Sequence, residues 1–432
     1  MKKMMFTMIV LTCLNSTGCS NGQAQEPEVE TLSNKVILEW NAVAYEAFGG
    51  ELYQNSVMAS RINAMVHLAM HDAINAIYPK YATYAFTGKD ASADPTAAAA
   101  SAAYEVLVHE IPNQKVFLDT ALNLTLLWIQ NGEAKQKGIA LGKQAGQAIL
   151  DNRANDGSAG DPIHPIAGIN MPGVYQTVPP FDFVFAPFWS DMKAFGLQKN
   201  DQFRSVPPPS LESEAYTVAF NEVKSLGRTG STLRTEEQTF YAKFWYEFSE
   251  AGWNRVARTI ATDKNLDLYE TARLFALVDM AMADAYIAGW DSKFHYNLWR
   301  PYTAIRYADQ DGNSGTMGDL EWEAEMPTPP VQDYPSTHSA LGNAAATVIA
   351  NLVDGSTSFT MISPTAVPAN SSRSFNSVKQ AADENADSRV QAGIHFRFAC
   401  TAGQDMGDKI GLWLVNNYLQ PLSADQVANT KN

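Results

Sequence analysis

Cysteine is scarce in this chain, which has three among its 432 residues. Cys13 and Cys19 lie close to the amino terminus, so Cys400 stands alone in the body of the sequence. A single internal thiol excludes an internal disulfide framework. It also excludes a structural zinc site built on cysteines.

Positive charge is scarce as well, with 31 lysines and arginines against 46 acidic residues and a net charge of −15. A surface of this charge repels the phosphates of nucleic acids, so we expect no nucleic acid partner. An anionic ligand would need a local basic pocket that works against the overall field. The hydrophobic share of 46% is ordinary for a globular protein and argues against disorder.

Long apolar runs are confined to the amino terminus. Two lysines precede an apolar stretch at residues 4–14, which is typical of a secretory signal peptide over residues 1–18. The end of this segment resembles a bacterial lipobox, in which Cys19 would carry a lipid anchor, although Ser16 stands where leucine is usual. We therefore expect an exported bacterial protein. A periplasmic protein, an outer-membrane lipoprotein and a secreted protein remain open alternatives.

The chain has no convincing alternating strand pattern, whereas apolar residues recur every three or four positions over most of its length. Residues 157–209 are the exception, because they hold nine prolines and predict a long irregular excursion of the kind that usually has a function. We expect an all-α fold of two packed helical bundles, at residues 35–228 and 229–420, after a tether at 19–34 and before a tail at 421–432. The spacing predicts helices at residues 36–48, 58–77, 97–111, 114–152, 235–248, 268–290, 336–352, 377–398 and 405–418.

Three segments in the second half of the chain carry residues suited to binding an anion. Lys293 and Arg300 stand seven residues apart, so on a helix both would point the same way. Ser336 is a natural N-cap ahead of an alanine-rich helix, which leaves the amides of Thr337 and His338 free for an anion.

The third segment contains Arg389 and His395, which would lie about 120° apart around one helix. Together the three segments supply three cations, backbone donors and two histidines. This set predicts a pocket for a tetrahedral oxyanion with an imidazole on each side. Each segment alone is more often structural, but all three in this order are a far rarer coincidence.

The segments resemble the signature shared by vanadium-dependent haloperoxidases and type 2 phosphatidic acid phosphatases, including bacterial class A acid phosphatases. That signature reads Lys-x6-Arg-Pro, then Pro-Ser-Gly-His, then Ser-Arg-x5-His-x3-Asp. The first segment matches fully, whereas Thr337 replaces the glycine of the second and Ala399 replaces the final aspartate of the third. The length and the additional bundle ahead of the signature resemble the chloroperoxidase-like haloperoxidases, since the class A phosphatases are about half as long.

This resemblance implies that His395 Nε2 is the axial ligand of vanadate and that His338 is the acid–base residue at the opposite apical oxygen. The cofactor would be orthovanadate, without haem or flavin. The substrates would be hydrogen peroxide and a halide, with a small organic acceptor as a further candidate. The remaining oxygens would be held by Lys293, Arg300, Ser336, the Thr337 amide and Arg389.

Two further residues bear on the choice of halide. Trp290 stands where the chloroperoxidase-like branch carries a tryptophan at the halide site, whereas Val331 replaces a phenylalanine there. Together with Ala399, this favours iodide and bromide over chloride. Two other functions stay open. One is a vanadate-inhibited acid phosphatase with a phosphohistidine at His395, and the other is a binding protein for phosphate-like anions.

Other candidates favour structural roles. His67 and His71, followed by Asp72, have the spacing of metal ligands on a helix, but no glutamate base lies between them and the surrounding residues are apolar. We therefore expect packed, hydrogen-bonded histidines. His295 would either line the mouth of the pocket or be solvated. A core position is expected for Trp245, Tyr246 and Trp253.

Overall fold

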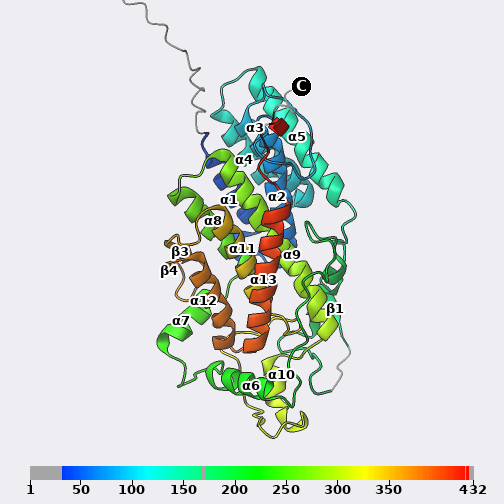
Figure 1. The fold of residues 1–432 in the computed structure, drawn as a ribbon, viewed down its shortest axis with the longest axis vertical. Helices are drawn as coiled ribbons and strands as arrows, with labels where there is room; N and C mark the ends of the chain where they lie inside the picture. Colours follow the sequence, from blue (N-terminus) through cyan, green and yellow to red (C-terminus); the bar gives the residue numbers. More distant parts are fainter. Residues whose placement is uncertain (1–31, 167–170, 424, 428–432) are drawn as a thin grey trace, which may run out of the picture. The chain divides into compact units, whose positions relative to one another are not determined.

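The computed structural model describes residues 32–166, 171–423 and 425–427, and all of these except Leu32 belong to the compact unit Ser33–Asn432. The predicted signal peptide, Cys19 and most of the tether lie outside the described residues. So do parts of the predicted tail. The described part is mainly helical, as expected (Figure 1). None of its helices is both long enough and apolar enough to cross a membrane.

The first group of helices packs closely because small residues face one another. On α5, a Cβ at Gly142 would lie 2.2 Å from the Ala98 carbonyl oxygen of α3, so these backbones approach as only glycine allows. α2 is buried along almost its whole length and is capped by Asn55, whose side chain accepts from the Met58 amide. The group consists of α1 (Lys35–Ala47), α2 (Ser56–Asn75), α3 (Pro95–Glu110), α4 (Lys115–Leu127) and α5 (Glu133–Arg153).

The second group surrounds α9 (Leu268–Tyr296), which also packs against α2 and so connects the two groups. Asp267 and Glu270 form a capping box at its start, and Asn297 ends it in the left-handed conformation. Figure 1 shows α13, in red, beside α9 and α11. The partners of α9 in this group are α11 (Thr337–Leu352) and α13 (Arg397–Asn417), and α12 (Val378–Gln391) packs against both of these.

Shorter elements complete the described part. The further α-helices are α6 (Glu214–Leu226), α7 (Glu236–Phe244), α8 (Ser249–Asp263) and α10 (Pro301–Arg306). The 3-10 turns are η1 (Gly50–Leu52), η2 (Pro112–Gln114), η3 (Pro187–Asp191) and η4 (Ala308–Gln310). Two antiparallel pairs form, β1 (Ile163–Pro165) with β2 (Phe183–Phe185) and β3 (Phe359–Ser363) with β4 (Ser371–Phe375).

The structure corrects the sequence prediction in several places. The strands were missed because they have only three to five residues, too few to establish a period. The predicted helix at 114–152 is interrupted around Gly132, and the one at 235–248 ends at Phe244. The predicted helix at 377–398 breaks at Gly393, whose φ of 78° does not fit a right-handed helix.

The proline-rich excursion is irregular, as predicted, and a buried carboxylate attaches it to α9. Asp284 accepts hydrogen bonds from the amides of Phe195, Gly196 and Leu197 at 2.6, 2.8 and 3.0 Å. This attachment holds the excursion against the helix that carries Trp290 and Lys293.

Candidate active site

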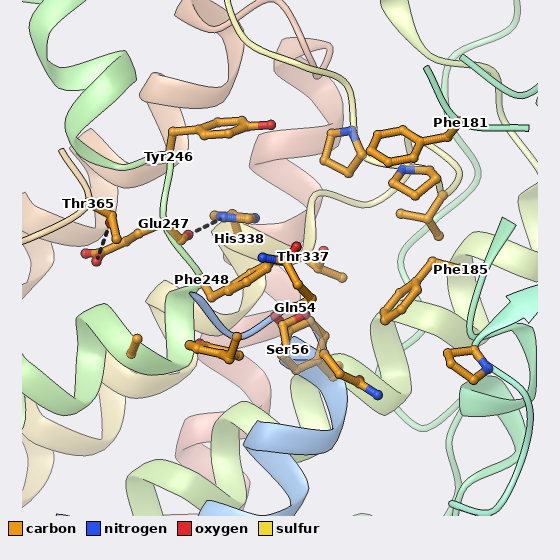
Figure 2. A pocket seen from close by; sticks show the side chains of 18 of the residues that line it. Gln54, Ser56, Phe181, Phe185, Tyr246, Glu247, Phe248, Thr337, His338 and Thr365 are labelled. Carbon is orange, nitrogen blue, oxygen red and sulfur yellow. Dashed lines mark hydrogen bonds between the residues drawn. The ribbon is translucent and has the colours of Figure 1, made fainter. Parts of the chain in front are cut away.

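A cavity of about 650 Å³ lies among the loop after α1, the excursion, α9 and the amino terminus of α11. One part of its lining is a cluster of polar and charged residues that we call the basic cluster: Arg300, Thr337, His338, Arg389 and His395. The other part is an aromatic wall, seen in part in Figure 2, made of Phe181, Phe183, Phe185, Phe248, Tyr286 and Trp290. The structure thus unites all three sequence segments, as expected.

Lys293 and Arg300 do not share a helix, contrary to the expectation from their spacing. α9 ends at Tyr296, and Arg300 is the N-cap residue of α10. Arg300 lines the cavity and donates to the carbonyls of Val331 and Ile394, at 2.6 and 2.7 Å. Lys293 is fully buried behind the lining, where Nζ donates to the carbonyl of Gln332 at 2.5 Å. Burial, reinforced by Arg300, holds the pKa of Lys293 well below its usual value.

Ser336 caps α11 as predicted. Its hydroxyl accepts from the Ser339 amide at 3.4 Å and from the Ser339 hydroxyl at 3.0 Å, and it is fully buried behind the cavity lining. Thr337 does line the cavity, and its methyl packs onto α9, where a Cβ at Gly289 would lie only 2.6 Å from Thr337 Cγ2. The absence of a side chain at Gly289 therefore makes room for the methyl that replaces the usual glycine.

His338 is half-buried and is held by one ring nitrogen. Nε2 donates to the Glu247 carbonyl at 2.8 Å, a contact drawn in Figure 2, so Nδ1 is the nitrogen left for chemistry. Burial, followed by the charge of Arg389, holds the pKa of His338 well below its usual value. The imidazole is therefore neutral at neutral pH and can accept a proton.

Arg389 has unpartnered donors. It is fully buried and donates from Nη1 to the Trp245 carbonyl at 2.9 Å, whereas its Nε and Nη2 have no partner in the described part of the chain. Buried N–H groups without acceptors are rare, and in a cavity lining they indicate a place for an anion. Burial lowers the pKa of Arg389 to about 10, so the guanidinium stays charged at neutral pH.

His395 lies in the link between α12 and α13. The expectation that it shares a helix with Arg389 is therefore wrong. Arg300 Nη1 lies 3.0 Å from its Nε2. On the other side, its Nδ1 lies 2.9 Å from the Oδ1 of Asp333. Burial, followed by Arg300 and Lys293, holds the pKa of His395 well below its usual value.

Asp333 is the site residue that the sequence reasoning missed. It is fully buried, within 3.8 Å of Arg300, and burial raises its pKa to about 7 against the opposing effect of Arg300 and Lys293. One signal was available, since the missing aspartate at position 399 requires that any carboxylate beside His395 come from another segment.

Comparisons with known proteins agree with this geometry. Residues 273–423 match the family model described as the VCPO second helical-bundle domain. The vanadium chloroperoxidase of Curvularia inaequalis is 25% identical in an alignment of 500 positions, gaps included, which covers 88% of this chain and 81% of that protein. A bacterial vanadium-dependent iodoperoxidase has a similar structure, with a TM-score of 0.79 and 28% identity, over 91% of this chain and 98% of that one.

The chain therefore resembles vanadium haloperoxidases in sequence and in fold over most of its length. A bacterial vanadium-dependent chloroperoxidase in its holo form shares the fold, with a TM-score of 0.69 at 17% identity, over 93% of this chain and 98% of that one.

The residues present fit the vanadate that vanadium haloperoxidases require. Arg300 and Arg389 line the site, and Arg389 has two buried N–H groups without a partner in the described part of the chain, which the oxygens of an oxyanion can accept. No group of three or more histidines, cysteines and acids in the described part of the chain could hold a bare metal cation. The donor set suits an oxyanion instead.

The two residues predicted for a halide pocket, Trp290 and Val331, both line the cavity. Trp290 is almost fully buried and donates to the Phe185 carbonyl at 3.2 Å. Val331 lies beside the excursion, because the Phe185 amide donates to the neighbouring Pro330 carbonyl at 2.8 Å. The excursion therefore brings aromatic rings next to the position where a phenylalanine is missing.

Most of the other residues considered from the sequence have structural roles, and Tyr246 also lines the cavity. His67 is fully buried, with Nδ1 2.6 Å from Asp279, and His71 is fully buried beside Asp72, which confirms the packed histidines. His295 is exposed and does not line the cavity. Trp245 and Trp253 stack in the core, as predicted. Tyr246 was misplaced in the prediction, because it lines the cavity 5.6 Å from the Arg389 guanidinium.

Proposed function

We propose that this protein is a vanadate-dependent haloperoxidase that oxidises iodide or bromide with hydrogen peroxide. One observation carries the proposal: two neutral imidazoles and an arginine with unpartnered donors line the same buried basic cluster. The similarity to vanadium haloperoxidases supports the proposed use of vanadate, and the iodoperoxidase among the similar structures supports iodide as a substrate.

Bound vanadate would supply the Lewis-acid centre at which hydrogen peroxide becomes electrophilic towards halide. His395 would hold it through Nε2, while Arg300, Arg389 and the helix amides at Thr337 would bind its oxygens and withdraw charge. Lys293 would act from behind the lining, where Nζ donates to the carbonyls of Gln332 and Asp333 and so supports the loop ahead of α11. The reaction consumes one peroxide, one halide and one proton, and it forms hypohalous acid and water.

His338 would move the proton. Its neutral ring accepts a proton at Nδ1 as peroxide binds, and the same nitrogen returns the proton when the halide is oxidised. The Glu247 carbonyl keeps Nε2 engaged throughout, so the ring cannot turn away. The aromatic wall would limit the access of water to this step.

The proposal includes a small organic acceptor. A cavity of about 650 Å³ is larger than a halide and peroxide need, and its volume and apolar lining are typical of sites for organic molecules. Phe181 and Phe185, which Figure 2 shows on the same side of the pocket, would pack against a planar ring of such an acceptor. Transfer of halogen to an aromatic C–H would release water.

The first prediction separates the haloperoxidase from the phosphatase. We expect apoprotein given vanadate, peroxide and iodide to iodinate a phenol dye, and apoprotein given p-nitrophenyl phosphate without vanadate to release little nitrophenol. Both are measured by absorbance on one preparation. Phosphate should inhibit reconstitution, since both tetrahedral anions use the same donors. Efficient phosphate-ester hydrolysis without vanadate-dependent iodination would contradict the proposal.

The second prediction concerns the halide. We expect the vanadate-loaded enzyme to turn over iodide and bromide well and chloride poorly, because chloride needs the most electrophilic oxidant and the tightest exclusion of water. Val331 leaves space where a larger ring would exclude water. Steady-state rates for the three halides test this order, and the variant Val331→Phe should raise chloride turnover relative to iodide. Chloride turnover equal to that of bromide in the wild type would show that the interpretation of Val331 is wrong.

A further inference from the structure

The carboxylate missing at position 399 has a counterpart elsewhere in the fold. Asp333 is fully buried, with its Oδ1 2.9 Å from His395 Nδ1. By distance and angle neither of its oxygens has a hydrogen-bond partner within the described part of the chain, although the nearby Phe396 amide lowers its pKa. A buried carboxylate is costly unless a donor reaches it, and His395 is a donor within reach.

The segments that carry positions 333 and 399 pack together, 66 positions apart in the sequence, and Asp333 is close enough to act by its charge on Cys400. The Ser336 amide donates to the Ala399 carbonyl at 2.9 Å, and this fixes the segment that carries Asp333 against the turn that carries His395. The Ala399 side chain is fully buried in the same apolar cluster as Tyr334. A carboxylate attached to either segment can therefore reach the same imidazole.

We propose that Asp333 replaces the missing carboxylate and is a positioning residue for His395. A guanidinium can only donate hydrogen bonds, so Nε2, the ring nitrogen nearer to Arg300, is the acceptor. The proton of the neutral ring then sits on Nδ1, facing Asp333. This tautomer leaves the Nε2 lone pair on the side of the basic cluster, where it could bind the central atom of an oxyanion. The identification of that oxyanion as vanadate rests on the proposed function.

The variant Asp333→Asn distinguishes positioning from charge by the sign of its effect. Asp333 lies beside Lys293 and Arg300, so loss of its negative charge should by Coulomb's law alone strengthen the binding of an anion. A positioning role predicts the opposite, because a ring free to change tautomer presents the wrong nitrogen part of the time. We expect vanadate affinity to fall about 10- to 100-fold, the usual effect of losing a partner behind a metal ligand.

The experiment measures two quantities on wild type and Asp333→Asn. Equilibrium dialysis gives the vanadate dissociation constant, and ¹⁵N NMR of histidine-labelled apoprotein gives the His395 tautomer. The matched control is Asp72→Asn, which removes another fully buried carboxylate beside a histidine that does not line the cavity. It should lower the unfolding temperature without changing affinity or tautomer. Wild-type or tighter vanadate binding by Asp333→Asn would overturn the proposal, and so would an unchanged His395 tautomer.

A transfer of the carboxylate tests the equivalence of the two positions. The double variant Asp333→Ala with Ala399→Asp, checked for its fold by circular dichroism, should bind vanadate more tightly than Asp333→Ala. A folded double variant without this recovery would contradict the replacement, and if the double variant does not fold, Asp333→Asn still decides. If the wild type bound no vanadate, the proposed function would fail, whereas the NMR comparison would still decide the role of Asp333.

Discussion

Replacing His395 by alanine should abolish vanadate binding while leaving the protein folded. The Nε2 atom of His395 lies beside Arg300 in the basic cluster and is the atom proposed to bind vanadium directly. The other residues of the cluster would contact the vanadate oxygens only through hydrogen bonds and charge. Partners behind a metal ligand are worth about 10- to 100-fold in affinity, so removal of the ligand itself should cost more than about 100-fold. Equilibrium dialysis against vanadate measures the change.

The chain offers a matched control in His295→Ala. This histidine follows Lys293 by two positions, is exposed and does not line the cavity. The control should bind vanadate as the wild type does, and thermal unfolding should show both variants folded. Equal affinities for wild type and the folded His395 variant would remove His395 from the role of ligand.

Replacing His338 by alanine should instead keep vanadate bound and reduce turnover about 100- to 10,000-fold, the range of a general acid–base contribution. The ring acts through Nδ1 on a proton, whereas anion binding depends on the neighbouring cations. Burial holds the pKa of His338 well below its usual value, so the ring is neutral at neutral pH. The loss of turnover should therefore be seen at neutral pH. Stopped-flow rates with iodide, measured beside dialysis on the same preparation, separate the two effects.

Vanadate affinity and turnover of His338→Ala together decide the role of this histidine. Loss of vanadate affinity equal to the loss of turnover would make His338 a binding residue. Unchanged turnover would show that solvent or another group moves the proton. Added imidazole should restore part of the activity of His338→Ala only if the ring supplies acid–base chemistry.

Local signals in the sequence were enough to predict the helical class and most of the basic cluster. Ser336 caps its helix as its residue type and position predict, and the long α9 follows from its apolar residues and its capping box. The three segments meet because the fold brings them together. Their order and spacing in the sequence predicted that meeting, although not its geometry.

The missed features depend on contacts between distant residues. Asp333 belongs to the site because it contacts His395, which lies 62 positions away in the sequence. The residues around Asp333 in the sequence give no indication of this contact. Lys293 lies behind the lining because nearby backbone carbonyls accept from its ammonium group. The aromatic wall comes from an irregular excursion, where periodicity carries no information. The breaks at Gly132 and Gly393 were local signals that the helical spacing of the apolar residues concealed.

The contact between Thr337 and Gly289 has a consequence for the history of the sequence. Each position limits the other, because the threonine methyl occupies the volume that any side chain at 289 would need. Threonine at 337 is therefore accommodated most easily where 289 is glycine. A change at 289 alone would force the threonine side chain to move, whereas the same change beside a glycine at 337 would meet no methyl. Divergence at the two positions is therefore expected to be correlated among sequences of this kind.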